Sequence, residues 1–126
     1  MTKKKNATIL VKMGEKTFEL QNCAKTDGRD DSFPFKAELY MNGSLLAHYG
    51  IDLLGRETDI NPTDDQTKKV IDGLREWVKE NYSLFYNGKK LCDLDFETVV
   101  YLAAIKYACD GTTVFDIEKD DDIRRN

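Results

Sequence analysis

The sequence predicts an α+β domain in which an antiparallel sheet of four to five strands packs against two helices on one face. Three observations support this fold class. Two stretches of alternating apolar and polar residues, each interrupted by a glycine-containing turn, are typical of two hairpins in the N-terminal half. Two helical patterns follow them. A last alternating stretch, at residues 112–117, adds a C-terminal strand to the predicted sheet.

The first hairpin is expected at residues 7–13 and 16–22. Between them, Gly14-Glu15 matches the Gly-X pair of a two-residue type II′ turn. In that register Val11 lies opposite Phe18, and the neighbouring pairs also place their large apolar side chains on one face. The turn chemistry and the apolar pattern therefore predict the same hairpin.

A second hairpin is expected around Asn42-Gly43, and its turn admits two registers. A two-residue Asn42-Gly43 loop would place His48, the single histidine, on the apolar face. A three-residue loop, Met41-Asn42-Gly43 with a left-handed Gly43 in a bulge, instead pairs Leu39 with Leu45 and leaves His48 on the outer face. Because the second register buries more apolar surface, we predict the three-residue loop.

The first helix is expected to begin near Thr63, which forms a capping-box pattern with Gln66. Its core-facing residues recur at helical spacing and form one apolar stripe: Val70, Ile71, Leu74, Trp77 and Val78.

The end of this helix admits two interpretations. Leu84 and Phe85 stay in phase with the apolar stripe, so the helix can continue to Tyr86, with Asn87-Gly88 as its left-handed cap. Alternatively, the helix stops near Asn81, and residues 83–92 form a short hairpin about the same Asn-Gly pair. We favour the long helix.

The second helix is predicted in the most apolar stretch of the chain, residues 96–109. Asp93 or Asp95 can cap its start, and Asp110-Gly111 ends it. Apolar residues occupy two opposite sides of this helix: Phe96, Val99, Val100, Ala103 and Tyr107 on one, and Leu102, Ile105 and Cys109 on the other. This pattern predicts a helix that lies between two other layers.

At 126 residues the chain is expected to form a single domain, with a flexible basic N-terminus at residues 1–6 and a flexible acidic tail at residues 118–126. The formal net charge of −4 argues against a nucleic-acid backbone as the main partner. Cys23, Cys92 and Cys109 are interpreted as reduced and mostly buried thiols, which indicates a cytoplasmic protein. No apolar run is long enough to span a membrane.

No motif in the sequence predicts a catalytic residue, a cofactor or a metal site. The loop that contains Asp27-Gly28-Arg29-Asp30-Asp31 lacks the pattern of a calcium-binding loop, and phosphate-binding glycine loops are missing from the sequence. Nothing in the sequence spacing requires His48 to meet Cys23 or Cys92. Helix capping accounts for Asp93 and Asp95 without a ligand.

We therefore expect a small intracellular, non-enzymatic protein that acts through protein contacts, as an adaptor, inhibitor or accessory factor. Its partner would be another protein or a second copy of the chain, with no membrane partner. The alternative is a nucleic-acid-associated regulator, which includes an acidic mimic of nucleic acid. A small enzyme that uses His48 or the Asp93 and Asp95 carboxylates is third. The expected interaction surface consists of Lys36, Glu38, Tyr40, His48 and Tyr86.

Overall fold

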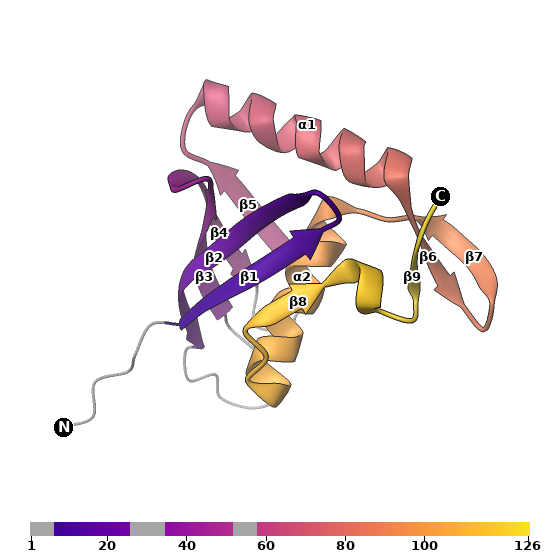
Figure 1. Cartoon of the computed structure of the whole chain (residues 1–126). Coiled ribbons are helices and arrows are strands. Elements are labelled where there is room, and N and C mark those ends of the chain that lie inside the picture. The colour runs from indigo at the N-terminus through magenta and orange to yellow at the C-terminus, as the bar shows by residue number, and fades with distance from the viewer. Residues whose placement is uncertain (1–6, 26–34, 52–57) are drawn as a thin grey trace.

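The computed structural model describes residues 7–25, 35–51 and 58–126, and it confirms the α+β class (Figure 1). The larger sheet, sheet A, contains β1 (Ala7–Met13), β2 (Lys16–Lys25), β3 (Phe35–Met41), β4 (Ser44–Ile51), β5 (Thr58–Pro62) and β8 (Val114–Asp116). The smaller sheet, sheet B, contains β6 (Tyr82–Tyr86), β7 (Lys89–Asp93) and β9 (Ile123–Arg125). The helices are α1 (Asp65–Asn81), α2 (Phe96–Asp110) and the short 3₁₀ helix η1 (Ile117–Lys119).

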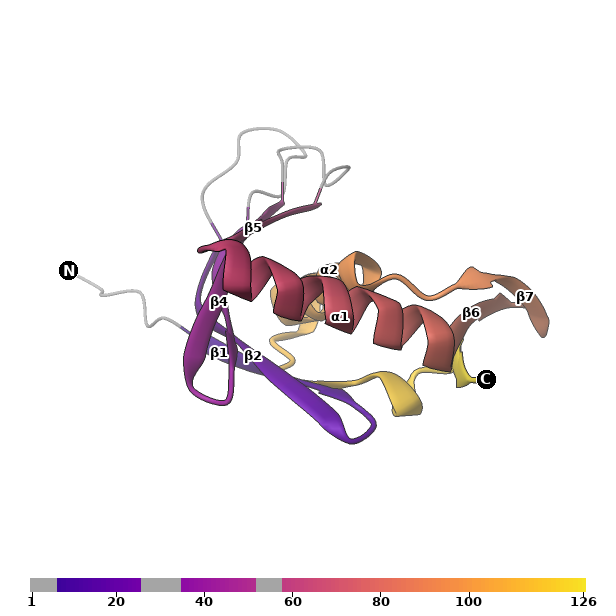
Figure 2. The same ribbon diagram turned by 90° about the horizontal axis from the view of Figure 1, so that it is seen from above.

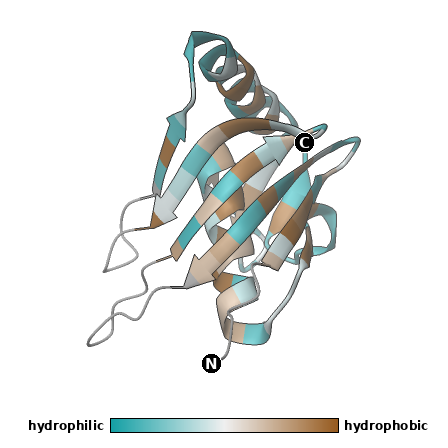
Figure 3. Ribbon diagram, turned by 90° about the vertical axis from the view of Figure 1, so that its left-hand side faces the viewer, coloured by the Kyte–Doolittle hydropathy of each residue, from teal (hydrophilic) through white to brown (hydrophobic). Residues whose placement is uncertain are grey.

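Sheet A has the strand order β5-β4-β3-β2-β1-β8, and it is antiparallel except where β8 runs parallel to β1. Both helices lie behind the strands when the sheet is viewed from its outer face (Figure 3). The sheet has more strands than predicted because β5 forms at residues 58–62, where the sequence analysis predicts no strand. Five residues that end in a proline give only a weak strand signal, and pairing with β4 stabilises them.

The first hairpin has the predicted register, with Val11 opposite Phe18 and Ile9 opposite Leu20. Gly14 has a φ of +67°, as the first position of a type II′ turn requires. The prediction of this hairpin is confirmed, and β2 extends three residues beyond it, to Lys25.

The predicted register of the second hairpin is wrong. Asn42 and Gly43 both have positive φ and form a two-residue turn between Met41 and Ser44. A bulge then follows inside β4, where Leu46 is the extra residue between the pairs Tyr40↔Leu45 and Leu39↔Ala47. The prediction placed the extra residue in the turn, whereas the structure places it in this bulge. Beyond the bulge Ala47 and Tyr49 face the core, and His48 points outward, as expected.

The predicted long first helix is also wrong, because α1 ends at Asn81 and the chain turns into β6. Tyr82 and Ser83 are buried in the extended conformation, and β6 pairs with both β7 and β9. Leu84 and Phe85, which share the apolar phase of the helix, are therefore half-buried residues of a strand. At the start of α1 the capping box is formed by Asp64 with Thr67, one residue later than the sequence predicts.

The two sides of α2 differ in their burial. Phe96, Val99, Val100 and Ala103 are fully buried on the side that the sequence analysis places in the core. On the opposite side Leu102 and Ile105 are half-buried and Cys109 is exposed, so the prediction of two covered faces holds for one face only. Asp95 occupies the N-cap position without a side-chain cap bond, and the left-handed Gly111 ends the helix, as predicted.

The C-terminal residues are ordered elements rather than the frayed tail that the sequence suggests. They form η1 and β9, and Ile117 and Ile123 are buried among the core side chains. The predicted N-terminal arm at residues 1–6 and the aspartate-containing loop at residues 27–31 lie outside the described residues.

Candidate protein-contact surfaces

The structure divides the expected interaction surface between the two sheets. Lys36, Glu38 and Tyr40 on β3 and His48 on β4 lie together on the outer face of sheet A. Tyr86 lies instead at the end of β6 in sheet B, next to the turn that leads into β7. The five residues therefore belong to two separate candidate surfaces.

The outer face of sheet A is polar and hydrogen-bonded. His48 is opposite Glu38 in the strand register, with its Nδ1 3.7 Å from Glu38 Oε2. The Asn22 side-chain amide donates to the other oxygen of Glu38. Beside His48 lies a shallow hollow of about 360 Å³, which Lys36 and Asp59 also line. Such a face is what an antiparallel sheet usually presents to water.

The hairpin β6–β7 projects from the body of the molecule (Figures 1 and 2). It carries Tyr86 and Leu91, whose residue surfaces are 62% and 61% exposed. The other exposed large hydrophobic residues of the described part of the chain are Val70 on α1 and Val114 on β8, which are in different elements. The hairpin is thus where exposed apolar side chains of that part gather.

The same turn and bulge occur in β3–β4 and β6–β7. In the second case Asn87-Gly88 has positive φ at both residues, and the pairs Phe85↔Lys90 and Leu84↔Cys92 enclose Leu91 as the extra residue. The local sequences are correspondingly similar, LYMNGSLL at residues 39–46 and LFYNGKKL at residues 84–91. Comparison of these two segments is the sequence signal that favours a hairpin at β6–β7.

The bulged leucines of the two hairpins differ in their surroundings. Leu46 is 6% exposed and belongs to the core, whereas Leu91 is 61% exposed. In sheet A the strand that carries the bulge has a further neighbour, β5, while in sheet B the corresponding strand β7 is at the edge. Leu91 therefore occupies the bulge position that is buried in the other hairpin, but it lies exposed on an edge strand.

The hairpin carries basic side chains around its apolar residues. Lys90 pairs with Asp93 at 3.1 Å, and the guanidinium of Arg124 lies 4.7 Å from the centre of the Phe85 ring. Within the described residues neither Lys89 nor Arg124 forms an ion pair. Lys89 and Arg124 are therefore the cations at this hairpin that the described residues leave without an ion-pair partner.

The edge of β7 is poorly suited to pairing with another strand. Bulges and lysine side chains on edge strands interrupt or block the addition of further strands. β7 has both features, with the bulge at Leu91 and the side chains of Lys89 and Lys90. A partner would therefore contact the side chains of this hairpin rather than extend its sheet.

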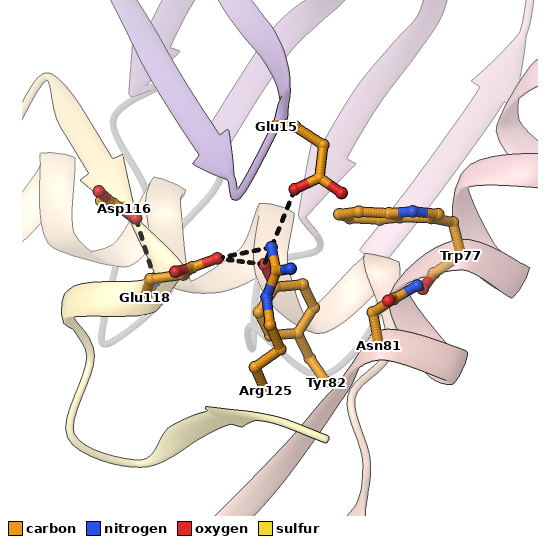
Figure 4. Close-up of polar contacts among 7 residues, drawn as sticks. All are labelled: Glu15, Trp77, Asn81, Tyr82, Asp116, Glu118 and Arg125. Atoms are coloured by element: carbon orange, nitrogen blue, oxygen red, sulfur yellow. Dashed lines mark hydrogen bonds and ion pairs between the residues drawn. The ribbon is translucent and has the colours of Figure 1, made fainter.

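A polar cluster at the base of the hairpin joins sheet B to the turn of the first hairpin (Figure 4). Arg125 Nη2 donates to Glu118 at 2.8 Å, to the Tyr82 hydroxyl at 2.8 Å and to Glu15 at 3.0 Å. The Tyr82 hydroxyl in turn donates to Glu118 at 2.6 Å. These bonds link β9, β6, η1 and the β1–β2 turn, so they hold the hairpin in a defined position.

The titration of the cluster follows from these contacts. Burial, and then the hydrogen bond to Glu118, raise the pKa of Tyr82 to about 12. The bond from Arg125 lowers the pKa of Glu15, and the bonds from Tyr82 and Arg125 lower the pKa of Glu118. The two carboxylates are thus held in their charged forms by the partners that they bind.

The structure does not bring the predicted catalytic candidates together. His48 is in sheet A, whereas Asp93 is in sheet B, paired with Lys90, and Asp95 is exposed at the start of α2. Among the described residues there is no group of three or more His, Cys, Asp or Glu side chains placed to hold a metal ion. Among the described residues no helix is both long and apolar enough to cross a membrane.

The three cysteines are free, and the expectation that they are mostly buried is wrong for two of them. Cys92 and Cys109 are exposed. Cys23 is buried, with its thiol 3.2 Å from the Leu20 carbonyl oxygen, and burial raises its pKa to about 11.

Comparison of the chain with protein-family models, with curated proteins and with solved structures finds no match.

Proposed function

We propose that this chain is a non-enzymatic cytosolic protein that acts through contact with another protein, and that the hairpin β6–β7 makes this contact. The observation that supports the proposal is the exposure of the bulged leucine Leu91, at a position where the matching hairpin buries Leu46. Tyr86, on the partner strand of the same hairpin, is a second exposed large apolar side chain. Apolar and aromatic anchors of this kind form the centre of most protein interfaces.

The charges of the hairpin indicate the charge that the partner's surface should carry. Lys89 and Arg124 have no ion-pair partner among the described residues. Lys89 lies in the same hairpin as the apolar anchors, and Arg124 lies on the adjacent strand β9. An interface gains specificity when opposite charges face one another at its rim. We therefore propose a partner that has an apolar recess for Tyr86 and Leu91 and acidic side chains around it.

The outer face of sheet A has a secondary part in this proposal. Lys36, Glu38, Tyr40 and His48 present mainly polar groups, and the ion pair of Glu38 with His48 is exposed to water. Exposed ion pairs contribute little to binding or stability. These residues can orient a partner, whereas the anchors are on the hairpin.

Site-specific photocrosslinking in the cell tests the contact. A benzophenone amino acid in place of Tyr86 should join the full chain to a discrete second protein, and the same group in place of Val70 on α1 should not. Leu91→Ser should reduce the crosslink at position 86, while the matched change Val114→Ser leaves it unchanged. When the crosslinking is repeated in a cell lysate, raising the salt concentration should weaken capture, because the proposed rim contacts are ionic.

Three results would contradict the proposal. Equal crosslinking at positions 70 and 86 would show that the hairpin is not selective. A crosslinked product with the mass of two copies of the chain would show self-association instead of a different partner. Salt-dependent binding to single-stranded nucleic acid that Leu91→Ser abolishes would assign the hairpin to the alternative function, nucleic-acid association.

A further inference from the structure

A second site lies at the free edge of sheet A, beside β8. A hollow of about 390 Å³ opens there, and it is lined by three lysines from three separate elements, Lys12 of β1, Lys106 of α2 and Lys119 of η1. All three lysines are exposed. Their position around one hollow depends on the parallel pairing of β8 with β1 and on the turn at Gly111 that ends α2.

The three ammonium groups are not neutralised by ion pairs. No ion pair joins any of them to a carboxylate within residues 7–25, 35–51 and 58–126. Lys12 is opposite Asp116 in the strand register, yet their side chains are not paired. Several lysines that line one hollow without forming ion pairs make a suitable binding site for a phosphate group, which lysine binds as a point charge.

The hollow also contains hydrogen-bond acceptors. Asp116 Oδ1 accepts the backbone N–H of Glu118 at 3.0 Å, and Asp120 Oδ1 accepts that of Asp122 at 2.9 Å. Each carboxylate therefore has a second oxygen that these turn bonds do not use, and such an oxygen accepts hydrogen bonds from ligand hydroxyl groups. The Thr112 hydroxyl adds a group that can donate or accept.

From this arrangement we infer that the hollow binds a small phosphorylated polyol, of the sugar-phosphate class. The phosphate contacts the ammonium groups of Lys12, Lys106 and Lys119, and the hydroxyl groups contact Asp116 and Asp120. The volume is within the range of small-ligand sites, and Val114 and Phe115 supply apolar wall. This site is independent of the protein contact proposed for the hairpin β6–β7.

The charge balance of the hollow explains why a ligand needs both kinds of group. Three lysines face two aspartates, so the lining has only a small positive excess, in a chain that is negative overall. A bare anion would meet the aspartates as well as the lysines. A molecule that offers phosphate at one end and hydroxyl donors at the other satisfies both groups of side chains.

Isothermal titration calorimetry with the full chain tests the inference, with ribose 5-phosphate as the probe. Ribose 5-phosphate should bind more tightly than inorganic phosphate, and ribose should not bind. Lys106→Gln and Lys119→Gln should each weaken binding of ribose 5-phosphate by roughly tenfold, since each removes a hydrogen bond to a charged group. Lys68→Gln, at an exposed position of α1, is the matched control and should leave binding unchanged.

A further variant tests the role of the acceptors. Asp120→Asn keeps the side-chain oxygen that accepts the Asp122 N–H, and it should reduce the preference for ribose 5-phosphate over inorganic phosphate. The inference is overturned if ribose 5-phosphate does not bind at millimolar concentration, or if Lys68→Gln weakens binding as much as Lys106→Gln. Binding of an acidic peptide at the hollow without binding of ribose 5-phosphate would also overturn it. Circular dichroism spectra should confirm that every variant is folded.

Discussion

Substitution of Gly14 tests how closely the two sheets are joined. Gly14 is in the β1–β2 turn with a φ of +67°, and it faces the polar cluster at the base of the projecting hairpin. A Cβ at this position would lie 2.2 Å from Arg125 Nη2 and 2.6 Å from the Tyr82 hydroxyl oxygen. Both distances are far below van der Waals contact, so Gly14→Ala must displace both groups or shift the turn itself.

The expected cost of Gly14→Ala has two parts. Placing a side chain at positive φ costs about 1–2 kcal/mol. The Arg125 side chain is long and partly exposed, so it can swing away, whereas the Tyr82 ring is fully buried and cannot. Disturbing the hydrogen bonds of a buried hydroxyl adds about 1–3 kcal/mol. Gly14→Ala should therefore lower the free energy of unfolding by about 2–5 kcal/mol.

Urea denaturation measures this change, with the fluorescence of Trp77 as the probe. The Trp77 ring is 5.8 Å from the Tyr82 ring, so its emission should report the state of the cluster, and circular dichroism at the helix band should give the same midpoint. Gly43→Ala is the matched control, because Gly43 has a φ of +80° and nothing within 4 Å of the added Cβ. It should cost about 1–2 kcal/mol.

A double-mutant cycle separates the two parts of the cost. In a Tyr82→Phe background the hydroxyl that obstructs the new methyl is missing, so Gly14→Ala should cost about 1–3 kcal/mol less than in the wild-type background. If Gly14→Ala and Gly43→Ala have equal effects in the wild-type background, the close approach at Gly14 does not constrain the structure. The argument that the polar cluster holds sheet B in place would then be refuted.

Three further predictions concern stability. Leu46→Ala should lower the free energy of unfolding by about 2–5 kcal/mol, whereas Leu91→Ala at the matching bulge should change it by less than about 0.5 kcal/mol, as measured by urea denaturation. Tyr49→Phe should be neutral or stabilising in the same assay, because the buried Tyr49 hydroxyl has no hydrogen-bond partner among the described residues; a loss above about 1 kcal/mol would contradict this. The carboxylates that bind Arg125 have pKa values lowered from 4.5, so their contribution is complete above that pH and is lost as the pH falls through the lowered values. Thermal melts between pH 7 and pH 3 should therefore show a smaller acid destabilisation for Arg125→Gln than for the wild-type chain, and equal slopes would contradict the pairing.

In the second hairpin, β3–β4, the sequence pattern predicts which side chains face the core but not the position of the bulge. The requirement that His48 face outward and that alternate residues face the core is correct. With a regular two-residue turn it requires one additional, unpaired residue between Leu39 and Ala47. The pattern does not say where that residue lies. The structure places it at Leu46 within the strand, because Asn42-Gly43 already satisfies a two-residue turn, with both residues at positive φ.

The end of α1 shows a different limit. Leu84 and Phe85 have the spacing of the apolar stripe, and this local signal favours a longer helix. Strand β9, about forty residues later in the chain, pairs with β6 and provides a competing set of hydrogen bonds. Burial of Tyr82 then decides the outcome, because its ring packs against Trp77 and its hydroxyl reaches Glu118 only when the chain is extended there.

The candidate sites depend even more strongly on tertiary structure. The sequence analysis expects Tyr86 in an interaction surface, whereas Leu91 becomes a candidate only when its exposure is compared with that of Leu46. The lysines of the second site, Lys12 and Lys119 among them, are separated by about a hundred positions of sequence, and no local pattern connects them.

The sequence by itself determined the α+β class, the first hairpin with its register, the outward position of His48 and the end of α2 at Gly111. These features depend on alternation, turn chemistry and helix caps, which act over a few neighbouring residues. Only the tertiary structure decided the hairpin β6–β7, the pairing of β9 with β6 and the separation of the expected surface into two. Each of these depends on hydrogen bonds and burial between segments that are distant in the chain, and such partners leave no local signal.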